Sequence, residues 1–451
     1  MPATPYWLPV DRVGPSTPAR RLTRSAGEPS DGAVATLAVA LGLMALVSPK
    51  GPLHGAPIDL VMVLGIFVSF LWALRSRAKL RLPFVIPMTG LVATGLLAAL
   101  VSASPQSGAV AAVQEIFLLL WCAAIATVCR TPRSLGIVLR AWALGATAWA
   151  ALLVAAVVTG VPGIGEVGTR ARLFFDHPNM AGNFFMIGVF IVVASGYPRR
   201  LPLRIGACLI LVSAMFLTGS NAALLSLIGG GVVVLFLNLR ARKGLIQATA
   251  VVAVLVGGLG IVWVEVAVPL VQAAQQSDNP LFRYSVGRGA RSADNRESLF
   301  LSQLQLFEQG NLLGIGPAGT RAALDDAAAT TAKEAHNDYL GTLVERGPLG
   351  ALALAGLIGG VVARSVRITR RPLPPHLARV VPVPAALVGA AAAFALTALT
   401  HEVLHYRWLW ALFGVLAALH LLLRAGPGDP GHAPSGEPPR AGLVPVTPRV
   451  R

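Results

Sequence analysis

The residues best suited to chemistry lie in a long hydrophilic stretch, from about 271 to 347, between two apolar segments. Its end carries His336, Asn337 and Asp338, followed by apolar residues at helical spacing, which predicts a short amphipathic helix from about Asn337. Gly347-Pro348 should end that helix. Histidine can serve as a general base near neutral pH, since its unperturbed pKa is about 6.5. A solvated loop histidine is the simpler interpretation of His336 taken alone.

Arginines accompany this histidine in the same stretch and in a second one, from about 161 to 179. The guanidinium group stays charged and binds phosphate with two parallel hydrogen bonds. These arginines could therefore clamp a phosphate-bearing lipid, although solvated loops or general attraction to anionic headgroups would also account for them. The binding candidates are Arg170, Arg172, Asn179, Arg288, Arg291 and Arg296, together with Asn337 and Asp338 next to His336.

Two segments match known motifs literally. Gly314-Ile-Gly-Pro-Ala-Gly319 fits G-x-G-x-x-G, but no strand precedes it, so we expect a turn whose backbone N–H groups face an anion rather than a dinucleotide site. His401-Glu402-Val-Leu-His405 fits H-E-x-x-H, which on a helix would place two histidines on one face as zinc ligands, with Glu402 acting on a bound water. No third ligand stands out, so an integral-membrane zinc metallopeptidase is the alternative and not the preferred interpretation.

The composition is that of a polytopic helical membrane protein. Of 451 residues, 55% are hydrophobic and 13% charged, with a mean hydropathy of +0.68. The apolar runs are near 20 residues long, as membrane-spanning helices require. The net charge of +17 does not indicate nucleic-acid binding, because aromatic residues are sparse and do not interleave with a basic patch. The three cysteines lie in apolar segments, which argues against disulfides and thiolate metal sites.

The chain divides into two tails and one membrane domain. Residues 1–32 and 425–451 are rich in Pro, Gly and Arg and predict disordered tails, and 33–424 predict an all-α bundle of about twelve transmembrane helices with one large loop, 271–347, carrying short helices. Most of the 37 lysines and arginines fall in alternate loops, which predicts that those loops and both termini are cytoplasmic. The expected spans are 33–48, 57–74, 83–101, 109–128, 135–160, 179–195, 203–218, 222–239, 245–270, 348–365, 380–400 and 407–424.

Three stretches resemble the superfamily of O-antigen ligases and O-antigen polymerases, which are bacterial membrane glycosyltransferases. The order, spacing and expected outer location of the stretches agree over roughly residues 135–420. One difference is that Asn221 stands where members often carry arginine after serine. The stretches are Arg-Ala-Arg-Leu-Phe-Phe-Asp-His-Pro-Asn (170–179), Asn-Arg-Glu-Ser-Leu-Phe (295–300) leading to Gly-Ile-Gly-Pro (314–317), and His-Asn-Asp-Tyr-Leu (336–340) with Glu-Arg-Gly (345–347).

The resemblance implies transfer of a glycan from a polyprenyl-pyrophosphate carrier to an acceptor hydroxyl on a glycan or lipid, at the outer face of the bacterial cytoplasmic membrane. No metal or other cofactor is expected, and the partners are the lipid-linked donor, the acceptor and membrane lipid. In this hypothesis His336 is the general base, Arg296 with Arg170 or Arg172 binds the donor pyrophosphate, and Asn337 and Asp338 could orient His336. Ligase and polymerase activities are not distinguished. A transporter or binder of lipid-linked glycan is a further alternative.

Overall fold

The structure, a computed structural model, describes residues 28–47, 55–102, 104–161, 164, 170–278, 283, 289–310, 312–320, 323 and 337–425, with the side chains of 289–297 excluded. Within these ranges the chain is helical and contains no strand, as the sequence predicts. The two predicted tails fall almost entirely outside the described residues.

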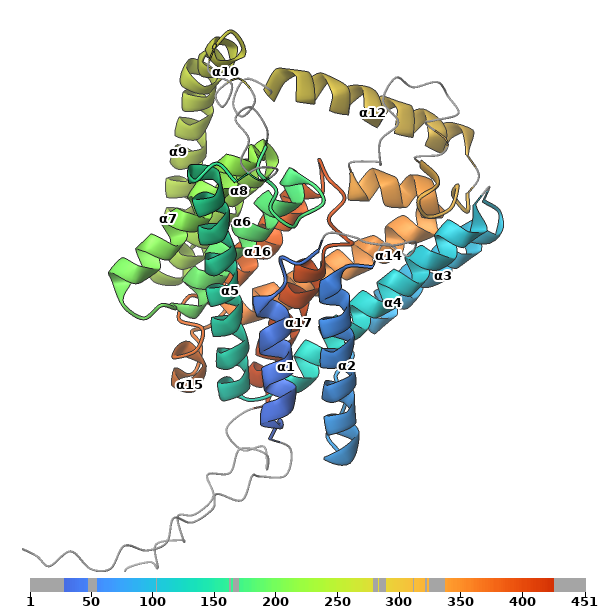
Figure 1. Cartoon of the computed structure of the whole chain (residues 1–451), viewed down its shortest axis with the longest axis vertical. Coiled ribbons are helices and arrows are strands. Elements are labelled where there is room, and N and C mark those ends of the chain that lie inside the picture. Colours follow the sequence, from blue (N-terminus) through green and yellow to red (C-terminus); the bar gives the residue numbers. More distant parts are fainter. Residues whose placement is uncertain are drawn as a thin grey trace, which may run out of the picture.

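Every predicted span coincides with a helix. Nine helices of the described part are long and apolar enough to cross a membrane, whereas α1, α3 and α16 are shorter. The chain is a multi-pass membrane protein. The helices are α1 (Asp31–Gly42), α2 (Pro57–Arg75), α3 (Val85–Leu100), α4 (Pro105–Val128), α5 (Pro132–Val158), α6 (Pro178–Ser195), α7 (Leu201–Thr218), α8 (Asn221–Lys243), α9 (Leu245–Val262), η1 (Trp263–Ala267), α10 (Val268–Gln275), α12 (Gly289–Gln309), α14 (Asp338–Thr369), α15 (Pro375–Ala378), α16 (Pro384–Thr397) and α17 (Arg407–Arg424) (Figure 1).

Several predicted boundaries are wrong by a few residues. The first span is expected to reach residue 48, but α1 ends at Gly42 and a short turn follows. The span expected at 245–270 continues to Gln275, because α9 passes through the π-helical turn η1 into α10. The expected span 380–400 is represented by the shorter α16. Such errors arise because hydropathy changes gradually where a helix leaves the bilayer, whereas a cap fixes the end of the helix.

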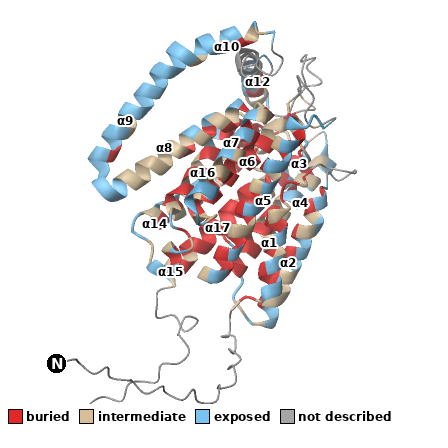
Figure 2. Cartoon of the chain, turned by 60° about the vertical axis from the view of Figure 1, so that its left-hand side comes forward, coloured by how far each residue is buried: buried red, intermediate tan, exposed pale blue. Residues whose placement is uncertain are grey.

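The core of the bundle is built around α17. Most of its residues are buried, including Trp408, Trp410 and His420, and it packs closely against α4. By contrast, α9 is almost entirely exposed and stands apart from the other helices, joined to them through α8 (Figure 2). Its exposed side chains are apolar, for example Val254 and Ile261, as expected of a helix facing lipid tails.

The helix α14 is two helices joined at a kink. Gly347 has a φ of 66°, a left-handed conformation that glycine adopts without a Cβ clash, and Pro348 follows it. The short helix Asp338–Arg346 therefore ends at Gly347-Pro348, as the sequence predicts.

The glycine motif at 314–319 packs against this kink. Ile315 N donates to Val344 O at 3.1 Å and Gly316 N donates to Glu345 O at 3.0 Å. Gly314 has a φ of 87°, and a Cβ there would lie 2.5 Å from the carbonyl of Glu345. The expectation that these N–H groups face an anion is wrong for Ile315 and Gly316, because both are bonded to the chain itself. The glycines of this motif allow its backbone to pack directly against the backbone of residues 344–346.

Candidate functional site

A network of polar side chains lies where α6, α7, α8 and α16 come together at one end of the bundle. Arg170 donates from Nε to the Thr218 carbonyl at 2.7 Å and from Nη2 to Asn179 Oδ1. Ala171 N donates to the Leu217 carbonyl at 3.1 Å. The segment before α6 is thus bound to carbonyls at the C-terminus of α7, which have no partner inside their own helix. Two of the predicted binding residues, Arg170 and Asn179, are thus in contact, and their role in donor binding stays a prediction.

Asn179 extends the network to a histidine 222 residues away. Its Nδ2 bonds to Nε2 of His401, and Nδ1 of His401 lies 3.1 Å from the Thr400 hydroxyl. Because Asn179 Oδ1 accepts from Arg170, its Nδ2 must be the donor, so His401 Nε2 accepts. His401 is 4% exposed.

A second layer of hydroxyl and amide groups lies beneath these residues. Asn183 Nδ2 donates to the Asn179 carbonyl at 2.9 Å, and the Thr397 hydroxyl donates to Asn183 Oδ1 at 3.2 Å. Thr397 also lies 2.9 Å from the Ser226 hydroxyl. Asn183, Thr397 and Ser226 are buried, and their bonds connect α6, α16 and α8. We refer to Arg170, Asn179, His401, Asn183, Thr397 and Ser226 as the Asn179 network.

The H-E-x-x-H segment at 401–405, which suggested the zinc alternative, does not form a helix. Residues 401–406 are a loop between α16 and α17, so His401 and His405 do not share a helical face. The reason is that Val403 N donates to Asp338 Oδ2 at 2.8 Å rather than to a carbonyl one turn earlier. His401 is engaged by Asn179, and His405 packs edge-on against Tyr406. The helical premise of the zinc metallopeptidase alternative is therefore wrong.

Asn337 and Asp338 fix the start of α14 beside this loop. Asn337 caps the helix, since its Oδ1 accepts from Tyr339 N at 2.9 Å and Leu340 N at 3.0 Å. Asp338 is buried, and its N–H donates to the Ala398 carbonyl at 3.0 Å. The backbone that follows His336 in sequence is thus held against the segment that carries His401.

The remaining predicted site residues are dispersed or undescribed. Arg172 is exposed, and its Nη1 donates to the Asp176 carbonyl at 3.0 Å. His336 and Arg288 lie outside the described residues. Arg291 and Arg296 belong to α12, but their side chains are outside the described part. The roles of these four residues in catalysis and donor binding stay predictions.

A largely buried ion pair joins α14 to α4 near the kink. Arg346 Nη1 donates to Glu115 Oε2 at 3.0 Å and to the Leu91 carbonyl at 2.9 Å, and Nη2 bonds the other carboxylate oxygen. Beside it, Glu345 Oε1 accepts from the Thr320 hydroxyl at 2.9 Å. The short helix Asp338–Arg346 is thus anchored at both ends, by Asp338 to the 401–406 loop and by Arg346 to α4.

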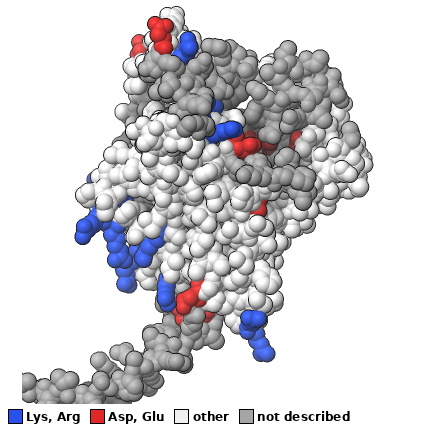
Figure 3. All heavy atoms as spheres, viewed as in Figure 1, with Lys and Arg blue, Asp and Glu red and all other residues white. Residues whose placement is uncertain are grey.

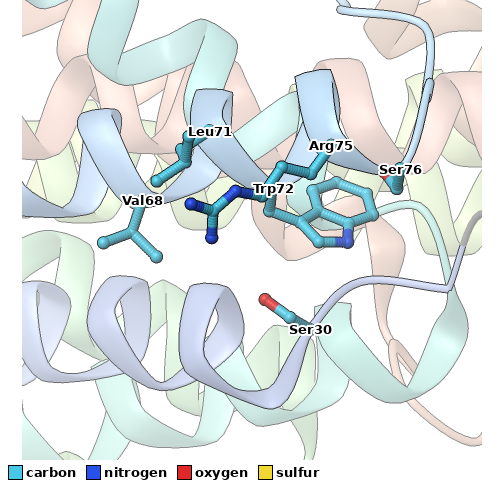
Figure 4. A pocket seen from close by; sticks show the side chains of 6 residues that line it. All are labelled: Ser30, Val68, Leu71, Trp72, Arg75 and Ser76. Carbon is cyan, nitrogen blue, oxygen red and sulfur yellow. The ribbon is translucent and has the colours of Figure 1, made fainter.

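Charged side chains of the described residues are unevenly distributed on the face shown by Figure 3. There, their basic side chains gather toward the lower end, where α2 and α15 end. A cavity of about 350 Å³ at this lower end is lined by Ser30, Val68, Leu71, Trp72, Arg75 and Ser76 (Figure 4). Arg75 is the only ionisable residue of that lining, so this cavity offers no acid–base pair.

A comparison with known protein families finds a match, which covers the middle of the chain. The O-antigen ligase family model matches residues 206–355, which run from α7 through α12 to the first part of α14. The chain is similar to the O-antigen ligase family over this segment, which makes up about a third of its length. No curated protein matches the chain.

The O-antigen ligase segment contains His336, Arg296 and Asn221, and it excludes Arg170, Asn179 and His401. The matched range, 206–355, is shorter than the range of roughly 135–420 expected from the resemblance. Asn221, the position that differs from the family pattern, is the first residue of α8 and is exposed, directly after the capping residue Ser220. The network residues outside the match come from helices packed against the O-antigen ligase segment, α6 against α7 and α16 against α8.

Proposed function

We propose that the chain transfers a glycan from a polyprenyl-pyrophosphate carrier to an acceptor hydroxyl. The observation that carries this proposal is the O-antigen ligase match over residues 206–355 in a multi-pass membrane protein. The Asn179 network supports it, because it brings polar residues together at the same end of the bundle as the start of α14, next in sequence to His336.

In the proposed reaction the acceptor oxygen bonds to the sugar carbon that carries the pyrophosphate. The carbon–oxygen bond to the pyrophosphate breaks, and polyprenyl pyrophosphate leaves with the bonding electron pair. His336 takes the acceptor proton as general base. Arg296 and Arg172 stabilise the negative charge that grows on the leaving group, where fixed cations contribute most to rate.

Arg170 acts through the network in this proposal. Two of its nitrogens are engaged by Thr218 and Asn179, so its guanidinium is held in one orientation. Asn337 and Asp338 position the backbone after His336, by capping α14 and by binding the 401–406 loop. They are positioning residues and not ligands of the donor.

The active face is assigned to the outer side of the cytoplasmic membrane. The support is the charge distribution, since the loops with most of the basic residues are retained in the cytoplasm of bacterial membrane proteins. Single cysteines at 172 and 242, in a variant lacking Cys122, Cys129 and Cys208, would be probed in intact cells with a membrane-impermeant thiol reagent. We expect labelling at 172 and not at 242, and the reverse would overturn the orientation.

Transfer activity is tested with purified protein in nanodiscs, a lipid-linked oligosaccharide and a panel of glycan and lipid acceptors. The proposal predicts a glycosylated acceptor and released polyprenyl pyrophosphate in equal amounts. Arg296→Ala should weaken donor binding and turnover, and Arg296→Lys should restore only part, because an ammonium cannot reproduce the bidentate contact. Donor binding with no transfer to any acceptor would instead favour a binder or transporter of lipid-linked glycan.

A further inference from the structure

A second cavity, of about 590 Å³, lies at the end of the bundle opposite to the Asn179 network. It is formed by the segment between α2 and α3 together with the C-terminal parts of α14 and α17. No acidic residue lines it. The basic residues among its lining are Lys79, Arg81, Arg130, Arg364, Arg367, Arg424 and His420.

Two of these arginines are oriented by uncharged groups. Arg130 donates from Nε to the Thr127 carbonyl at 2.9 Å and from Nη2 to the Lys79 carbonyl at 2.8 Å, and it lies 5.0 Å from the Trp72 ring centre. Arg81 donates to the Ala126 carbonyl at 3.3 Å. Carbonyl groups and aromatic rings hold a guanidinium in place but carry no full negative charge, so the positive charges of Arg81 and Arg130 are not neutralised.

Arg364, which lies in α14, is also oriented by an aromatic ring and a carbonyl group. It lies 4.2 Å from the Phe84 ring centre and donates to the Gly360 carbonyl at 3.0 Å. Arg367 and Arg424 form no ion pair with any acidic residue of the described part of the chain. The cavity therefore concentrates positive charge that nothing in its lining compensates.

The positive charges also affect Arg130. Burial and, to a smaller extent, repulsion from the nearby Arg81 together lower the pKa of its guanidinium to about 10. An arginine so destabilised in its charged form gains from a bound anion, which offsets both effects.

His420 also lines the cavity. It is 6% exposed, and its Nδ1 is buried with no hydrogen-bond partner among the described residues. Because this atom has almost no exposed surface, it lies inside the wall and does not face a ligand in the cavity.

We propose that this cavity binds the phosphate group of a net-anionic phospholipid from the leaflet on the basic side of the membrane. A lipid fits better than a soluble anion because the lining is also apolar, with Leu80, Leu82 and Leu421, and because two of its walls belong to membrane-spanning helices. Basic pockets between helices near the cytoplasmic surface are typical sites for anionic headgroups. The site is independent of the proposed glycan transfer.

The test is titration of the full-length detergent-solubilised protein with phosphatidylglycerol and with phosphatidylcholine, with lipid binding followed by native mass spectrometry. The cavity variant is Arg367→Gln/Arg424→Gln, chosen because neither side chain contributes to an ion pair. The matched control, Arg370→Gln/Arg371→Gln, removes the same charge from exposed positions that do not line the cavity. Far-ultraviolet circular dichroism and gel filtration confirm that both variants fold.

We expect the wild type to prefer phosphatidylglycerol and the cavity variant to bind it about 25-fold more weakly, since each arginine near a headgroup contributes about fivefold. The control variant should bind within about twofold of the wild type. Equal losses in the two double variants would overturn the proposal, because general surface charge would then explain binding. Displacement of the lipid by inorganic pyrophosphate at equal or lower concentration would also overturn it, in favour of a soluble anion.

Discussion

Replacing Arg346 by methionine should destabilise the protein strongly, because it leaves the largely buried Glu115 without its cation. The two side chains are 11% and 19% exposed, and the pair is bidentate, with a further bond from Arg346 to the Leu91 carbonyl. Removing one partner of a buried pair typically costs about 3–5 kcal/mol. We expect Arg346→Met to lower the free energy of unfolding by that amount.

The matched controls separate the ion pair from the loss of one side chain. In Glu115→Leu/Arg346→Met both charges are gone, and buried pairs replaced by apolar residues are often close to neutral, so most of the stability should return. Arg133→Met breaks an exposed pair with Glu28, in which the arginine side chain is 69% exposed, and should change stability little.

The assay is thermal and denaturant-induced unfolding of purified protein in detergent, followed by tryptophan fluorescence. The reasoning is refuted if Arg346→Met unfolds like the wild type, or if the double variant is no more stable than the single one. In the second case Arg346 contributes through its packing at the kink rather than through its charge.

Three further predictions concern the candidate site and its supports. Asn179→Leu should cost about 1–3 kcal/mol, because it removes the hydrogen bonds to Arg170 and to the buried His401, and should also slow transfer, as measured by unfolding and by turnover. Gly347→Ala should cost at least about 1–2 kcal/mol from its positive φ alone, in addition to a Cβ that would lie 2.0 Å from the Leu312 carbonyl, so unfolding at wild-type stability would contradict the kink. His401→Ala should not change the zinc content of the purified protein, and a chelator should leave transfer intact; stoichiometric zinc lost in this variant would restore the metal-site interpretation.

The membrane helices were predictable because their signal is local. Each span is an apolar run of suitable length bounded by proline, glycine or charge, so hydropathy alone locates α2 or α5 to within a few residues. The kink at Gly347 was predictable for the same reason, since glycine and proline adjoin there. The ends of α1 and α16 were not, because they depend on turns rather than on hydropathy.

The partners within the candidate site could not be predicted in this way. Asn179 and His401 are 222 residues apart, and Arg346 and Glu115 are 231 apart, so no local spacing indicates either contact. At 401–405 the local pattern was misleading. A helix there would need the Val403 N–H, and the carboxylate of Asp338 takes that hydrogen bond instead.

The measurement that tests the central claim most directly is single-turnover glycan transfer by His336→Ala, with donor binding measured on the same preparation. A general base contributes about 10²–10⁴-fold to rate and little to the binding of a donor whose charge lies on its pyrophosphate. The account predicts that transfer falls by about that factor while donor affinity is retained. Transfer at the wild-type rate would contradict it.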